Sequence, residues 1–148
     1  MKRIRRILHA TDFSPASRPA FARAVEMAKA NRAELLLAHA MSPIVIPVGE
    51  GYISADVYDR IEASTRAASQ KQLKTLLARA RKAGARARTL LLDGIAHERI
   101  VRAARANHAD VIVIGTHGRT GLAKFFIGSV AARVLAIAPC PVLTVRGK

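Results

Sequence analysis

The sequence predicts a doubly wound α/β protein, in which helices cover both faces of a parallel sheet. Strand-like and helix-like segments alternate along the chain, the strand-like segments are apolar at nearly every position, and no long linker interrupts the alternation. A strand that is apolar throughout is buried on both faces, as in a parallel sheet. Right-handed crossovers then place helices on both sides. We expect one domain spanning residues 1–148, a usual domain length.

Five short runs rich in β-branched or aliphatic residues are the predicted strands. The segments VIVI and LLL illustrate their uniformly apolar character. The runs cover approximately residues 3–10, 33–40, 85–93, 110–115 and 141–145.

Four segments with helical spacing lie between these runs, at about 15–30, 55–83, 95–108 and 128–138. Ser14 and Pro15 are the expected cap and first position of the first helix, and Pro19 fits only within its opening turn. Gly84 suits the position after the second helix, and Pro139 ends the fourth. The residues expected to face the core are Phe21, Val25, Ala28, Ile61, Leu73, Leu76, Leu77, Ala80, Ile100, Val101, Ala104, Val130, Val134 and Ile137.

The chain is strongly basic, with 25 Lys and Arg residues against 10 acidic ones and a net charge of +15. A basic surface attracts phosphate on nucleic acid, membranes or nucleotides. The cations are scattered along the sequence, however, and aromatic residues that could stack on bases make up only 4%. We therefore expect a generally basic surface, with any nucleic-acid binding weak and independent of base sequence.

Several function classes find no support in the sequence. No apolar run is long enough to span a membrane, and the N-terminus lacks a signal peptide, so we expect a cytoplasmic protein. The single cysteine, Cys140, excludes an intramolecular disulfide. The five histidines show no metal-ligand spacing, and no Ser-His-Asp arrangement can be argued. We expect neither catalytic residues nor a metal site built by the protein alone.

Residues 115–130, GTHGRTGLAKFFIGSV, contain four glycines directly after a strand-like run. In open parallel sheets, ligands bind beyond the carboxyl ends of the strands. Glycines at 115, 118 and 121 would let the backbone adopt positive φ and approach a ligand closely. Their exposed amide groups can form a concave anion site. This segment is therefore a candidate phosphate loop.

The residues that follow strengthen the phosphate prediction. Gly128 and Ser129 open the last predicted helix, whose N-terminus carries unpaired N–H groups and a partial positive charge. Arg119 and Lys124 add full positive charges. The alternative is a glycine-rich turn and helix cap without a ligand. The pattern is neither a dinucleotide fingerprint nor a Walker A sequence.

The spacing Gly115-x-x-Gly118, nine residues, then Gly128-Ser129 resembles the ATP-binding signature of the universal stress protein family. The stretches ILHATDFSPAS, DGIAHERIVRAA and APCPVLTV resemble its first strand and loop, the start of its third helix, and its closing strand. The resemblance covers nearly the whole chain. It implies a Rossmann-like sheet in the order 3-2-1-4-5, ATP at the carboxyl end, a dimer, and a role as a nucleotide-dependent stress-response switch or sensor.

The resemblance also implies which residues form the site. Thr11 and Asp12 would face the ribose and phosphates, and Asp12 is a candidate partner of Mg²⁺ as well. Met41 would lie near the adenine, which the backbone of Asp93 and Gly94 would contact. His9 stands where the family often has a small apolar residue at the pocket floor. The ribose and phosphates would be held by Gly115, Gly118, Arg119, Gly128, Ser129 and Val130.

The last predicted strand is the candidate dimer contact. In the implied order it lies at the sheet edge, where Pro141 is tolerated because no central ladder needs its N–H. Val142, Leu143 and Val145 make this edge apolar, and two copies could pair along it to form a homodimer. A monomer with a covered edge is the alternative.

Three functional questions stay open. The same site could serve a slow ATPase, although no residue is an evident base for positioning water. A basic nucleic-acid or protein-interaction module without nucleotide is the third class. The connection at residues 41–54 is either a surface loop or a lid.

Overall fold

A computed structural model describes residues 2–45, 51, 53–117 and 127–147. Five strands form one sheet in the order β3-β2-β1-β4-β5, and every neighbouring pair is parallel. The predicted fold class and the implied strand order are therefore confirmed. The strands are β1 (Arg6–Ala10), β2 (Glu34–Met41), β3 (Arg86–Asp93), β4 (Val111–Gly115) and β5 (Val142–Val145).

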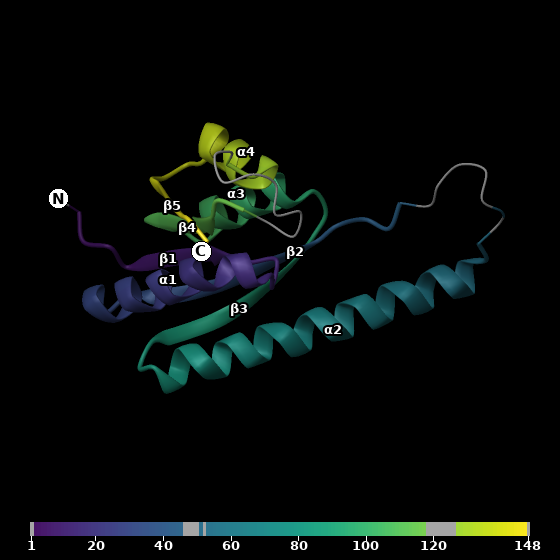
Figure 1. Cartoon of the computed structure of the whole chain (residues 1–148), viewed down its shortest axis with the longest axis horizontal. Coiled ribbons are helices and arrows are strands. Elements are labelled where there is room, and N and C mark those ends of the chain that lie inside the picture. The colour runs from purple at the N-terminus through teal and green to yellow at the C-terminus, as the bar shows by residue number, and fades with distance from the viewer. Residues whose placement is uncertain (1, 46–50, 52, 118–126, 148) are drawn as a thin grey trace.

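Helices cover both faces of this sheet (Figure 1). Helices α1 (Arg18–Asn31) and α2 (Ala55–Lys82) pack on one face, and α3 (Ala96–Ala106) and α4 (Ser129–Ile137) pack on the other. A short 3₁₀ turn, η1 (Pro15–Ser17), leads into α1.

Alternation along the strands produces two separate apolar cores. On β1, Ile7 faces α1 and α2, whereas Leu8 faces α3 and α4, and both side chains are fully buried. On β4, Val113 and Ile112 divide in the same way. Successive side chains of a strand point to opposite faces, so uniformly apolar strands supply both cores.

The helix ends follow the sequence signals with one exception. Pro19 lies in the first turn of α1, and Gly84, after α2, has the positive φ of 94° that favours glycine. Ser14 precedes η1, but its side chain makes no capping hydrogen bond. Ser14 and Pro15 thus occupy the predicted cap and first positions, but the cap position lacks its side-chain hydrogen bond. The Ser14 N–H donates to Asp12 Oδ1 at 2.9 Å, so the Asp12 side chain organises this turn instead.

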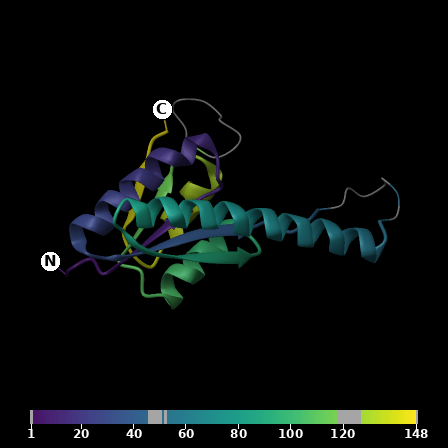
Figure 2. The ribbon, with the colours of Figure 1, turned by 90° about the horizontal axis from the view of Figure 1, so that it is seen from below.

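Three predicted core residues are wrong, because the helices extend beyond or sit at the margin of the sheet. Ile61 is 41% exposed, since the first half of α2 extends past the strands (Figures 1 and 2). Val130 and Ile137 are 37% and 50% exposed, because α4 lies over the β5 side of the sheet. Within α4, Ala131 and Val134 form the buried contact.

No helix in the described part of the chain is both long and apolar enough to cross a membrane. The 41–54 connection lies partly outside the described residues.

Candidate functional site

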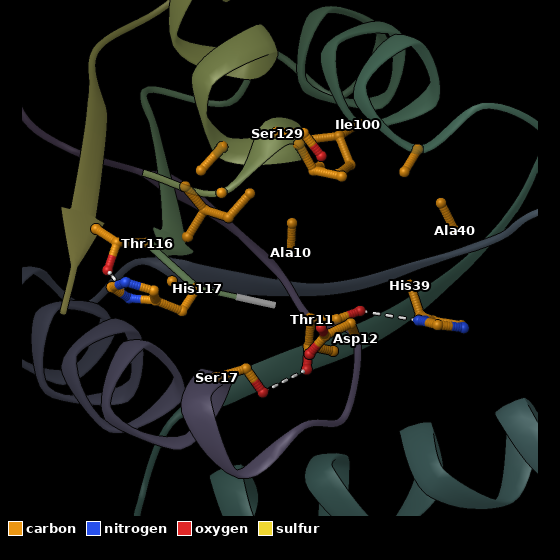
Figure 3. Close-up of a pocket in the computed structure, with 16 residues that line it drawn as sticks. Ala10, Thr11, Asp12, Ser17, His39, Ala40, Ile100, Thr116, His117 and Ser129 are labelled. Atoms are coloured by element: carbon orange, nitrogen blue, oxygen red, sulfur yellow. Dashed lines mark hydrogen bonds between the residues drawn. The ribbon is translucent and has the colours of Figure 1, made fainter. Parts of the chain in front are cut away.

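A pocket opens where β1 and β4 end, at the carboxyl edge of the sheet (Figure 3). Its volume is about 280 Å³. Central strands that diverge into different helix layers leave such a crevice, which is the usual ligand site of open parallel sheets. The β1 end contributes Ala10, Thr11 and Asp12, and the β4 end contributes Gly115.

Hydrogen bonds fix the turn that follows β1. Thr11 Oγ1 accepts from the Phe13 N–H at 3.0 Å and lies 3.2 Å from Ser17 Oγ. Asp12 Oδ1 accepts from the Ser14 N–H at 2.9 Å. Phe13 has a positive φ of 64°, which a non-glycine residue adopts only when its surroundings hold it there. The Asp12 carboxylate is therefore held in place beside the pocket.

The N-terminus of α4 forms the opposite wall. The Gly128 N–H donates to the Thr116 carbonyl, and the Thr116 N–H donates to the Val145 carbonyl at 2.9 Å. These bonds tie the start of α4 to the ends of β4 and β5. Gly128, Ser129 and Val130 all line the pocket, and no side chain within the described residues caps this helix. The Gly128 N–H is engaged by Thr116, whereas the N–H groups of the first turn, from Ser129 to Ala131, precede the first intrahelical donor, Ala132, and point toward an anion site.

The pocket lining includes two histidines, His39 and His117, that the sequence analysis did not predict as site residues. The Nδ1 of His39 donates to the Thr11 carbonyl at 2.8 Å, and its ring lies 4.3 Å from that of Phe13. The Nδ1 of His117 lies 2.8 Å from Thr116 Oγ1 (Figure 3). The other lining residues omitted from the prediction are Ala10, Ser17, Ala40, Ala96, Ile100, Ile114, Thr116 and Ala131. The position of His39 near the end of β2 was the available signal, since neighbouring parallel strands end at the same edge.

Met41, Asp93 and Gly94 line a second depression of about 260 Å³ rather than the pocket itself. Ala40 lines the pocket and Met41 the depression, so consecutive residues connect the two. The Gly94 N–H donates to the Met41 carbonyl at 3.0 Å. Arg66 Nη2 donates to Asp93 Oδ1 at 2.7 Å, and this hydrogen bond raises the pKa of Arg66. The Asp93 side chain is thus engaged by α2, and its backbone lies in the β3 ladder opposite Met41.

His9 does not form the pocket floor. Its ring points to the α1 side, 5.9 Å from the ring of Phe21, and Ala10 lines the pocket instead. The departure from the family pattern at His9 therefore leaves the described pocket lining unchanged.

The loop after β4 is only partly described. Gly115 is the last residue of β4 and has no positive φ, so the expected turn at this glycine is wrong. A Cβ at Gly115 would lie 3.5 Å from the Ala16 carbonyl oxygen, an ordinary contact. Gly118, Arg119, Gly121 and Lys124 lie outside the described residues.

Comparison with known proteins identifies the family. The sequence profile of the universal stress protein family matches residues 3–146. The chain belongs to the universal stress protein family. It is 36% identical over 140 residues to a universal stress protein of Thermus aquaticus, and the match covers 95% of this chain and 97% of that protein.

Solved structures of family members share the fold. MJ0577 of Methanocaldococcus jannaschii superposes with a TM-score of 0.84 at 22% identity, over 99% of both chains. A universal stress protein in complex with cAMP superposes with a TM-score of 0.74 at 26% identity, over 99% of this chain and 100% of that chain.

Proposed function

We propose that this universal stress protein binds ATP at the carboxyl edge of its sheet and acts as a nucleotide-dependent switch or sensor in a stress response. The observation that carries the proposal is the uncapped N-terminus of α4, which lines the pocket opposite Asp12. A helix N-terminus favours phosphate through its N–H groups and partial positive charge. The complex of a relative with cAMP supports an adenine nucleotide.

The residues of the pocket suit the parts of such a ligand. Gly128, Ser129 and Val130 would receive the phosphates, while Thr11 and Asp12 would face the ribose. The adenine would extend past Ala40 toward the depression lined by Met41, Asp93 and Gly94. Arg119 adds a positive charge and Gly118 a residue without a Cβ, and both favour a polyphosphate over a single phosphate.

A bound Mg²⁺ would depend on the nucleotide. The described residues bring together no group of three or more His, Cys, Asp or Glu side chains that could hold a metal ion. Asp12 supplies the one carboxylate among the described lining residues. The phosphates would have to provide further oxygen ligands, the type that Mg²⁺ prefers.

Identifying the nucleotide that copurifies with the protein tests this proposal. Denaturing the purified protein should release ATP, because a switch binds ATP without hydrolysing it. Release of ADP would support the slow ATPase that uses the same site. Release of no nucleotide, together with no calorimetric binding of ATP, would contradict the proposal and favour an interaction module.

The variant Gly128→Val tests whether the start of α4 receives the phosphates. Gly128 has φ −60° and ψ 153°, which any residue can adopt, so the substitution adds bulk to the pocket without backbone strain. We expect calorimetry to show an ATP affinity at least tenfold weaker, a loss of about 1.4 kcal/mol of binding free energy. The control Ala132→Val adds the same kind of bulk to the same turn, at a residue outside the pocket lining. Equal affinity in both variants would place the phosphates elsewhere.

We also propose a homodimer through β5. This strand is at the edge of the sheet, so one side of its backbone is unpaired within the described chain. Two copies related by a twofold axis could pair along it in antiparallel fashion.

A further inference from the structure

The opposite, amino end of the sheet carries a second concavity, of about 500 Å³. It is lined by the segment before β1 and by the first residues of β2 and β3. Six of its lining residues are cationic: Lys2, Arg3, Arg5, Arg6, Arg32 and Arg86. We call this set the basic concavity.

Two carboxylates also line the basic concavity, and both are engaged by the protein. Glu34 lies 3.2 Å from Arg88 Nε and 3.8 Å from Arg6 Nε. Asp110 Oδ2 accepts from the backbone N–H groups of Arg5 and Arg6 at 2.8 and 3.0 Å. These hydrogen bonds, together with Lys2 and Arg5 nearby, lower the pKa of Asp110. The cations of the basic concavity therefore outnumber its carboxylates, and its net charge is positive.

Five of the six cations form no close ion pair within the described residues, although Lys2 and Arg5 lie near enough to Asp110 to act on its pKa. Within the described part of the chain, no carboxylate forms an ion pair with Lys2, Arg3, Arg5, Arg32 or Arg86. All five side chains belong to exposed residues. Like charges gathered in one concavity repel one another, so a bound anion would stabilise this arrangement.

Helix dipoles explain only part of the cluster. Cations at the carboxyl end of a helix offset its partial negative charge, and Arg32, the C-cap residue of α1, is the lining cation in such a position. Lys2, Arg3 and Arg5 precede a strand, and Arg86 begins one, so no helix end accounts for them. These cations need another explanation.

The lining indicates the class of anion. It contains no Phe, Tyr or Trp side chain, and His108 is its one aromatic ring, whereas single-stranded bases stack on several aromatic side chains in succession. Ile4 is its one apolar residue, too little for insertion into a membrane. Several cations spread along a concave surface match a chain of regularly spaced phosphates. We propose that the basic concavity binds the phosphodiester backbone of duplex nucleic acid, independently of base sequence.

This proposal does not depend on the nucleotide pocket, which lies at the other end of the same strands. The test compares the wild type with Arg3→Gln/Arg5→Gln/Arg86→Gln. The matched control, Arg60→Gln/Lys71→Gln/Lys74→Gln, removes three exposed cations from α2, so both variants have the same net charge. Fluorescence anisotropy with two duplexes of unrelated sequence is recorded across a salt titration.

We expect the wild type to bind both duplexes alike, with affinity falling steeply as salt rises. In the concavity variant, the slope of log affinity against log salt should fall by roughly 2–3, because each lost phosphate contact removes about 0.9. Its affinity at low salt should fall at least about tenfold, and that of the control less than about threefold. Unchanged melting temperature and ATP binding would show that the variant is folded.

Three results would overturn the proposal. Equal weakening in the concavity variant and the control would mean that net charge alone governs binding. A strong preference for one duplex would mean that base edges are read elsewhere. Binding to vesicles rich in phosphatidylserine, without binding to either duplex, would assign the concavity to an anionic membrane.

Discussion

His9 is a polar side chain placed in an apolar core on the central strand. The residue is fully buried, its Nδ1 donates to the Val113 carbonyl at 3.0 Å, and its Nε2 has no hydrogen-bond partner among the described residues. Burial disfavours the charged imidazolium and lowers the pKa of His9 from 6.5 to about 4. The folded protein therefore holds His9 neutral at pH values where an unfolded chain would protonate it.

The first prediction concerns acid stability. Between pH 6.5 and about 4, the unfolded chain binds a proton at His9 that the folded protein does not. Above the unfolded pKa, His9 is neutral in both states and does not lower the free energy of unfolding. As the pH falls through that window, the free energy of unfolding falls by roughly 3 kcal/mol in total. In His9→Leu, urea unfolding should show a smaller loss of stability between neutral and acidic pH.

The difference between the two proteins isolates His9, because all other titrating groups are shared. An identical loss of stability in wild type and His9→Leu over this range would show that the burial of His9 does not govern the acid response.

Helix α2 differs between its two halves because its length exceeds that of the strand it covers. Its 28 residues span about 42 Å, whereas the 8 residues of β3 span about 26 Å. Leu73, in the second half, is 2% exposed and packs into the core, while Ile61, in the first half, is 41% exposed. The second half therefore anchors the helix, and the first half extends beyond the sheet (Figure 2).

The second prediction compares these two residues. Leu73→Ala should lower the free energy of unfolding by about 2–5 kcal/mol, because it leaves a cavity in the core. Ile61→Ala removes a side chain of the same size from the same helix, and we expect a cost below about 1 kcal/mol. Chemical denaturation measures both. A cost at Ile61 as large as at Leu73 would show that the first half of α2 is packed against something in solution.

At the scale of the whole molecule, β5 has one paired and one open side. The Ile112 N–H donates to the Pro141 carbonyl at 3.0 Å, and the Thr116 N–H donates to the Val145 carbonyl at 2.9 Å. Alternation along a strand then turns the backbone groups of Val142 and Thr144 away from β4. The side chains of Leu143 and Val145 already pack on the α1 side, and that of Val142 packs on the other. A dimer would therefore pair mainly through the backbone.

The third prediction tests the proposed dimer at this open side. Thr144→Pro removes an outward N–H without interrupting the ladder to β4, and proline is tolerated at such edge positions. We expect a folded monomer that still binds ATP, whereas the control Thr144→Val, which keeps the N–H, should stay dimeric. Light scattering at micromolar concentration measures the mass. A monomeric wild type, or a dimeric Thr144→Pro variant, would remove the β5 contact from consideration.

Local patterns in the sequence were sufficient for most of the fold. Uniformly apolar runs predict strands buried on both faces, and signals such as Pro19 and Gly84 mark helix ends, because both effects act over a few residues. Gly128 and Ser129 were correctly placed at the start of α4 for the same reason. The strand order came from the family resemblance, since apolar runs alone do not specify which strands pair.

Long-range packing decided the remaining features. Which way His9 points, and how far α2 extends past the sheet, depend on elements distant in sequence. Long-range packing also explains the glycine at position 147. A Cβ there would lie 2.9 Å from the Ala16 carbonyl oxygen, which is too close for a larger residue without a shift of the backbone. The cations of the basic concavity look scattered along the chain, yet parallel strands that start at one edge bring them together. The periodicity of a segment indicates only which of its residues could be buried. The neighbouring elements in the fold decide which residues are buried and which charged side chains lie together.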